Sequence, residues 1–137
     1  MEPRLSFVTL GVADLERSRA FYRDVLKLPP IPLPPDADVA FFELGRTWLS
    51  VWSRDALAAD AGLPSPAPAA PSFPGFSLAH NLRSIAEVDA LFDELRAAGV
   101  KIVQPPHRAE WGGYTGYFAD PDGFLWELAW NPHFPHT

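Results

Sequence analysis

The chain of 137 residues has the length of one domain, or of two small modules that share a core. Its 17 acidic and 11 basic residues give a formal net charge of −6, which excludes the basic surface that nucleic-acid or anionic-membrane binding needs. The sequence contains no cysteine, which excludes disulfides, thiolate metal sites and a cysteine nucleophile, and fits a location in the cytoplasm.

The first half predicts a strand, a helix and a hairpin, in that order. After an amino end without the apolar run of a secretion signal, residues 5–12 show the alternation of a strand. Asp14 is placed to cap a helix over residues 15–26, and the proline cluster at 29–35 predicts an extended loop. Residues 39–44 and 47–52 predict a β-hairpin, and residues 54–62 predict a short helix.

A linker rich in Pro, Ala and Ser, over residues 63–74, precedes a second series of the same elements. The prolines within the uncharged stretch 61–82 exclude a membrane helix. A strand over residues 76–82 leads to a helix over 85–98, with Ser84 and Glu87 at capping-box spacing. The strands expected next cover 100–103, 114–119 and 124–130, with a loop over 105–113 and a turn at 120–123.

The two halves of the chain match each other, which indicates an internal repeat. The matched pairs, seventy places apart, include Val8 with Leu78, Asp14 with Ser84 and Phe21 with Leu91. With a slightly longer shift, Gly45, Trp48 and Trp52 fall on Gly123, Trp126 and Trp130. The sequence therefore predicts an α+β fold of two βαβββ modules in one domain over residues 1–137. The modules cover about 4–54 and about 75–131, and Phe7 and Ser77 stand in equivalent places.

Residues 9–22, TLGVADLERSRAFY, and residues 116–128, GYFADPDGFLWEL, are the most informative segments. In this order and at this separation they resemble the vicinal oxygen chelate superfamily, which includes glyoxalase I, bleomycin-resistance proteins, fosfomycin-resistance proteins and extradiol dioxygenases. The resemblance implies paired βαβββ modules whose sheets curve round a cleft, and often a dimer. A tryptophan-rich chain with two small curved sheets also favours a homodimer.

The resemblance further implies where a metal would bind, with one ligand on each of four strands. These positions fall on Phe7, Leu49, Ser77 and Glu127, and the position at Leu49 is set to within one residue. Of these four residues only Glu127 has a donor suited to a divalent ion, and one carboxylate does not fix a metal site. We therefore expect no cofactor. A divalent metal held by ligands from unusual places, such as His80 or His107, stays open as an alternative.

Strand alternation also predicts which side chains meet a ligand. The side chains expected to share the concave face are Phe7, Leu49, Ser77, Asn81 and Glu127. The loop with paired glycines at 112 and 113 is expected to bring Trp111 and Tyr114 above that face. His80 has the opposite parity and is predicted to be a core histidine.

Three functions fit these residues. The favoured one is a metal-free protein that binds an aromatic or amphipathic small molecule in the cleft. The second is a glyoxalase-like lyase or isomerase, or a dioxygenase-like enzyme, with a metal on atypical ligands. The third is a metal-independent enzyme with Glu127 as general base and Tyr114 or Tyr117 as proton donor. The expected partners are a small molecule and a second copy of the chain, with no nucleic acid and no membrane.

Overall fold

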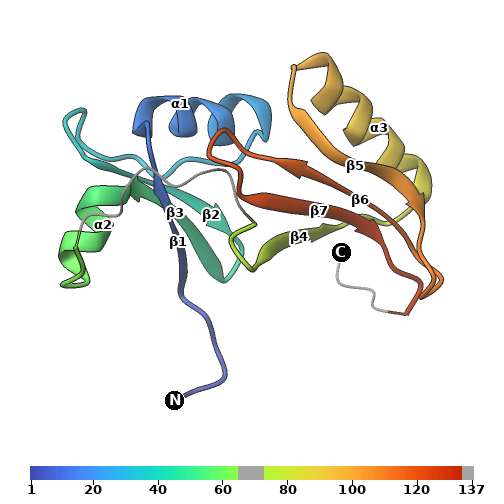
Figure 1. Cartoon of the computed structure of the whole chain (residues 1–137), viewed down its shortest axis with the longest axis horizontal. Coiled ribbons are helices and arrows are strands. Elements are labelled where there is room, and N and C mark those ends of the chain that lie inside the picture. The colour runs from blue at the N-terminus through green and yellow to red at the C-terminus, as the bar shows by residue number, and fades with distance from the viewer. Residues whose placement is uncertain (65–72, 134–137) are drawn as a thin grey trace. The chain divides into compact units, whose positions relative to one another are not determined.

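The computed structural model of the protein describes residues 1–64 and 73–133. The chain divides into two compact units, Met1–Ala70 and Pro71–Thr137, and each unit has its own sheet and helices (Figure 1). The α+β fold class predicted from the sequence is confirmed. Most of the predicted linker, at 65–72, lies outside the described residues. Within the described part of the chain, no helix has the length and apolar character needed to cross a membrane.

The first unit contains a three-stranded sheet and its helices. β1 (Phe7–Val12), β2 (Val39–Leu44) and β3 (Thr47–Ser53) lie in the order β1-β3-β2. β1 runs parallel and β2 antiparallel to β3. α1 (Leu15–Ala20) and the π-helix η1 (Phe21–Val25) connect β1 to β2, and α2 (Arg54–Asp60) follows β3.

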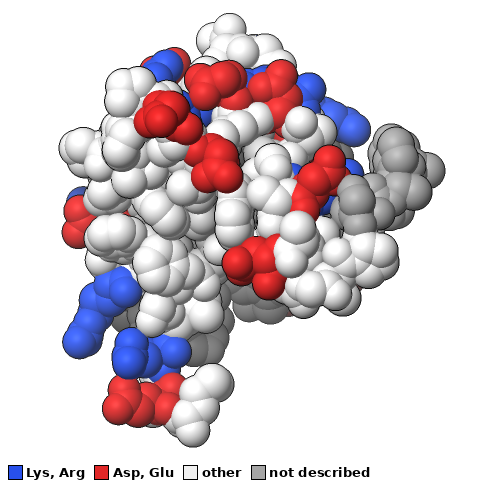
Figure 2. Space-filling view, turned by 90° about the vertical axis from the view of Figure 1, so that its left-hand side faces the viewer, with Lys and Arg blue, Asp and Glu red and all other residues white. Residues whose placement is uncertain are grey.

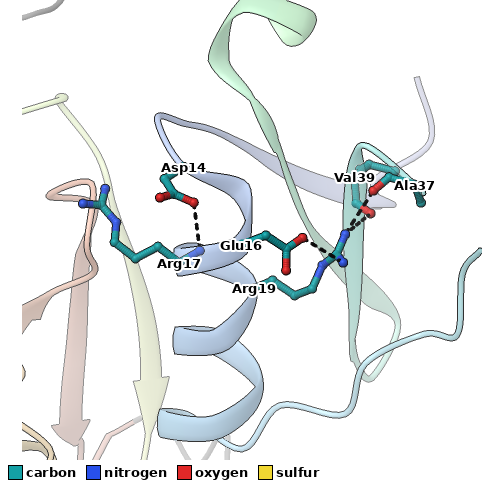
Figure 3. Close-up of polar contacts among 6 residues, drawn as sticks. All are labelled: Asp14, Glu16, Arg17, Arg19, Ala37 and Val39. Carbon is teal, nitrogen blue, oxygen red and sulfur yellow. Dashed lines mark hydrogen bonds and ion pairs between the residues drawn. The ribbon is translucent and has the colours of Figure 1, made fainter. Parts of the chain in front are cut away.

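The helix predicted over residues 15–26 therefore changes type along its length. It is α-helical to Ala20 and π-helical from Phe21 to Val25. Its predicted start is confirmed, because the backbone N–H of Arg17 donates to Oδ1 of Asp14 at 3.0 Å (Figure 3). A positive φ of 56° at Lys27 turns the chain into the proline-rich segment that follows.

One strand of the first module is reduced to a single bridge, which differs from the predicted βαβββ order. Pro30 pairs with Phe42 of β2, and the N–H of Ile31 donates to the carbonyl of Phe41 at 2.9 Å. Proline has no backbone N–H, so the proline-rich segment 29–35 does not sustain a ladder. The segment covers the edge of β2 as extended chain instead.

The second unit has the complete βαβββ order. It contains β4 (Ser77–Asn81), α3 (Ile85–Ala97), β5 (Lys101–Arg108), β6 (Tyr114–Ala119) and β7 (Leu125–Trp130). The sheet order is β4-β7-β6-β5, with β4 parallel to β7 and the other pairs antiparallel. The first unit has the same order: β1, β3 and β2 correspond to β4, β7 and β6, and the Pro30 bridge stands in the place of β5.

Two details of the second unit test the sequence analysis. The capping box is confirmed: the N–H of Glu87 donates to Ser84 Oγ at 3.2 Å, and the N–H of Arg83 donates to Glu87 Oε2 at 2.9 Å. The predicted loop over 105–113 is wrong in its first part, because β5 continues to Arg108. β5 is an edge strand with two register shifts, and prolines are tolerated at such edges and bulges.

The first sheet buries one face against α1 and η1, the second sheet buries one face against α3, and these two faces form the cores. The core of the first unit contains Leu10, Val12, Tyr22, Phe42, Leu49 and Val51. The core of the second unit contains Val88, Phe92, Leu95, Phe118, Trp126 and Leu128. Because side chains alternate along a strand, the remaining strand residues point to the opposite face of each sheet, where a ligand-binding site can be built.

Candidate functional site

Glu127 lies on the face of the second sheet that is opposite α3. Its neighbours in β7, Trp126 and Leu128, are buried in the core, so the half-buried Glu127 side chain points the other way. Glu127 is paired with Ala79 of β4 and with Tyr117 of β6. We call this side of β4, β6 and β7 the Glu127 face; it consists of Ser77, Ala79, Asn81, Thr115, Tyr117, Ala119, Leu125, Glu127 and Ala129.

Two residues of β6 with hydroxyl groups neighbour Glu127, and one of them hydrogen-bonds its carboxylate. Thr115, which is 4% exposed, donates from Oγ1 to Glu127 Oε1 at 2.7 Å. Tyr117 lies directly across the strand pair from Glu127. Burial is the largest cause that raises the pKa of Tyr117, and the negative charge of the nearby Glu127 raises it further. The phenol therefore keeps its proton at neutral pH and acts as a hydrogen-bond donor.

Ser77 and Asn81 share the Glu127 face, as strand alternation predicts. They stand on either side of Ala79 in β4, and Asn81 is half-buried whereas Ser77 is exposed. The sequence does not predict Thr115 as a partner of Glu127, and it predicts Tyr117 only as one of two proton donors. The cross-strand partner of Glu127 is predictable from the turn at 120–123. Pairing the residues of the two strands outward from that turn sets Tyr117 opposite Glu127.

The structure separates Tyr114 from this group, which corrects the prediction that it lies above the same face. The Tyr114 hydroxyl donates to Oδ1 of Asp89 on α3 at 2.8 Å, so its side chain is on the helix side of the sheet. That hydrogen bond is the main reason why the pKa of Tyr114 is raised. Tyr114 comes directly before Thr115 in β6, so alternation places its side chain on the opposite side of the sheet. There it connects β6 to α3.

Trp111 lies in the turn between β5 and β6 and is 44% exposed. Its indole ring lies against the backbone of Gly113, where a Cβ atom would collide with the ring. Gly112 has a φ of +93°, which favours glycine for a second, separate reason. The paired glycines therefore shape this turn, and contact between Trp111 and a ligand stays a prediction.

In the first unit, Phe7 and Leu49 lie on opposite faces of the sheet, so the prediction that they share a face is wrong. Phe7 is directly paired with Trp48, and Leu49 is fully buried under the helices. The residue of β3 that corresponds to Glu127 is Ser50: Ser50 pairs with Thr9, two residues after Phe7, as Glu127 pairs with Ala79, two residues after Ser77. Leu49 is thus a core residue.

The face of the first sheet that carries Phe7 is aromatic. The ring centroids of Phe7 lie 5.8 Å from Phe41 and 5.7 Å from Trp48, and Phe7 is 47% exposed. α2 packs at the other end of this face, where a Cβ on Gly11 would lie 3.2 Å from Leu57 Cδ2. The face offers flat apolar surface, with the carboxylate of Glu43 across the strand pair from Trp48.

These residues do not fit a divalent metal ion. Phe7 and Ser50 in the first unit, and Ser77 and Glu127 in the second, supply one carboxylate and two hydroxyl groups. Within 1–64 and 73–133, no group of three or more His, Cys, Asp or Glu side chains is arranged to hold a metal. His80 is exposed on the edge strand β4, which corrects the prediction of a core histidine.

Comparisons with known proteins agree with this architecture. The model of the Glyoxalase/Bleomycin resistance protein/Dioxygenase superfamily matches residues 4–128. The uncharacterized protein YraH of Bacillus subtilis (strain 168) is 32% identical over 126 residues, which are 91% of this chain and 96% of YraH. A glyoxalase-related enzyme from Fulvimarina pelagi is 33% identical, with a TM-score of 0.85 over 98% of this chain and 93% of that one. Lactoylglutathione lyase from Agrobacterium tumefaciens is 27% identical, with a TM-score of 0.74 and 97% of both chains covered.

Proposed function

The chain belongs to the glyoxalase/bleomycin resistance protein/dioxygenase superfamily, and from this premise we propose that it binds a small organic molecule without the help of a metal. One observation carries the proposal. Glu127 stands on its sheet face as a single carboxylate that accepts a hydrogen bond from Thr115 and lies across the strand pair from Tyr117, and the other positions that would complete a metal site lack suitable donors. Such a carboxylate is an anchor for a ligand group that donates hydrogen bonds.

The ligand class follows from the side chains around this anchor. The Glu127 face also carries the hydroxyl of Ser77 and the amide of Asn81, so it favours a polar head group with several hydrogen-bonding atoms. The ring of Tyr117 and the side chain of Leu125, which share this face, favour a flat apolar body. We infer an amphipathic ligand with an aromatic body and a cationic or proton-donating head group.

Three probes with the same aromatic body test this function: 2-phenylethylamine, 2-phenylethanol and phenylacetate. We expect the amine to bind most tightly, because it alone brings a cation to Glu127. Glu127→Gln keeps the shape and removes the charge, and it is expected to weaken amine binding by about fivefold, the effect of a partly exposed ion pair of about 1 kcal/mol. NMR titration of backbone amides gives the affinities and the binding face.

The matched control is Glu94→Gln, which makes the same change on the exposed side of α3. It is expected to change amine binding by less than about 1.5-fold, since screening weakens distant exposed charges. Equal binding of the amine and the alcohol, or an unchanged amine affinity in Glu127→Gln, would contradict Glu127 as the anchor.

A second candidate function is proton transfer, and the contact between Tyr117 and Glu127 favours it. A carboxylate next to a protonated phenol is the pair that a metal-independent enzyme uses as base and acid. In this candidate Tyr117, rather than Tyr114, is the proton donor, because the Tyr114 hydroxyl is bound to Asp89.

Metal analysis separates both candidates from a metal-dependent lyase or isomerase. Protein purified without a chelator is expected to contain well below one equivalent of zinc, nickel, iron or manganese, because Glu127 has too few partners with metal-binding donors. Elemental analysis by mass spectrometry checks this. Stoichiometric metal that is lost in Glu127→Gln would replace our proposal with a metal enzyme that uses atypical ligands.

Self-association and a cytoplasmic location belong to the same proposal. Exposed apolar side chains such as Phe7, Leu5 and Trp111 support a homodimer, because a surface of this kind is stabilised when a second copy covers it. The lack of cysteine supports a reducing compartment.

A further inference from the structure

A pocket in the first unit lies at the edge of its sheet, beside β2 and the proline-rich segment. It has a volume of about 170 Å³ and is bounded by the end of α1, η1, β2 and the proline-rich segment. The lining residues are Arg19, Arg23, Pro30, Ile31, Leu33, Pro34, Pro35, Val39, Ala40, Phe41 and Phe42. A cavity of about 150 Å³ with apolar walls holds a benzene molecule, so this pocket has room for one aromatic ring.

Prolines and a fixed arginine limit how far the walls of this pocket can move. Each proline holds its own φ near one value, which limits the conformations of the segment. Arg19 ties α1 to the chain that follows the segment: its Nη2 donates to the carbonyls of Ala37 at 3.1 Å and Val39 at 3.4 Å, and its Nη1 contacts Glu16 at 3.1 Å (Figure 3). A preformed site loses little conformational entropy on binding, which favours affinity for a small ligand.

The charged groups of the pocket lining are two guanidinium groups. Arg19 is fixed by its backbone partners, whereas Arg23 is about half exposed and forms two hydrogen bonds of 2.7 Å with the neighbouring Asp24. The hydrogen bond with Arg23 lowers the pKa of Asp24, so this carboxylate is charged and occupies the guanidinium fork. Planar guanidinium groups bind carboxylates in this two-pronged geometry.

The protein as a whole does not form a general anion trap. Acidic and basic side chains are interspersed along the upper rim of the side shown in Figure 2, and the chain as a whole carries a charge of −6. Selectivity for an anion therefore depends on the local guanidinium groups rather than on the field of the whole protein.

We propose that this pocket binds a small aromatic carboxylate, with the ring between the prolines and Phe41 and the carboxylate exchanging places with Asp24 on Arg23. The site is independent of Glu127, which belongs to the other unit, and of the function proposed for it.

The test uses benzoate, benzyl alcohol and benzylamine, which share the ring and differ in head group. Benzoate is expected to bind most tightly, with a dissociation constant in the millimolar range that is usual for so small a ligand. In NMR titrations the largest shift changes are expected at the backbone amides of Ile31, Val39 and Ala40. Equal affinity for benzyl alcohol would overturn the carboxylate class, and benzoate shifts confined to other residues would overturn the site.

Two exposed neighbours should change benzoate affinity in opposite directions. Arg23→Gln removes the guanidinium and is expected to weaken binding by about threefold, whereas Asp24→Asn removes the competing carboxylate and is expected to tighten it by about threefold. Neither residue is in the core, so both variants are expected to fold. Changes of the same sign in both variants would overturn the exchange of carboxylates on Arg23.

Arg96→Gln is the matched control, because it breaks the exposed Arg96–Asp93 ion pair of 2.7 Å on α3. Benzoate affinity is expected to stay within about 1.5-fold in this variant. Glu127→Gln, which is the test of the other site, is likewise expected to leave benzoate binding unchanged. A failure at one site is therefore distinguishable from a failure at the other.

Discussion

Replacing Leu49 by alanine is expected to destabilise the protein by about 2–5 kcal/mol, the usual range for a buried leucine that leaves a cavity. Leu49 is fully buried in the core of the first unit, together with Phe42 and Val51. β3 is the central strand of its sheet, so both neighbouring strands limit how far the backbone relaxes around the cavity. Urea unfolding followed by tryptophan fluorescence measures the loss.

Phe7→Ala provides the comparison on the opposite face of the same sheet. Phe7 is 47% exposed, so its removal is expected to cost less than about 1.5 kcal/mol, even though the side chain is larger. If the two variants lost equal stability, or if Leu49→Ala lost less than Phe7→Ala, Leu49 would not be the core residue that the structure shows.

The position of Leu49 shows why the candidate site was only partly predictable. Strand alternation on β4 and β7 was read from the sequence within one unit, and it placed Ser77, Asn81 and Glu127 on one face, as observed. In the first unit the correspondence between the modules was known to within one residue. A shift of one residue moves a side chain to the other face of the sheet. For this reason Leu49 was predicted at the position that Ser50 occupies in the structure.

The elements themselves were more predictable than the details of their ends. Helix caps at Asp14 and Ser84 have local chemical causes, so the sequence predicts them directly. Whether Pro105 continues an edge strand depends instead on the neighbouring strand, and the hydrogen bond from Tyr114 to Asp89 depends on how α3 packs. Contacts between elements far apart in the chain are not contained in local patterns, which explains these errors.

Replacing Gly116 by alanine is expected to destabilise the second unit by about 1–3 kcal/mol, because an added methyl group overpacks the core. A Cβ atom at Gly116 would lie 2.7 Å from Cζ of Phe92 and 2.9 Å from the carbonyl oxygen of Gln104. The phenylalanine ring is able to move, but the backbone of β5 has less freedom. Thermal or urea unfolding, with Phe92→Leu alone as the reference, measures the effect.

The consequence of Gly116→Ala for the site follows from its neighbours in β6. Gly116 lies between Thr115, which hydrogen-bonds Glu127, and Tyr117, which lies across the strand pair from Glu127, so displacement of β6 moves both hydroxyl groups. We expect Gly116→Ala to weaken 2-phenylethylamine binding along with stability. Phe92→Leu should relieve part of both losses, because it removes the nearer obstacle and leaves the Gln104 carbonyl in place. Effects of the two substitutions that add within about 0.5 kcal/mol would show instead that Phe92 and Gly116 do not press on each other.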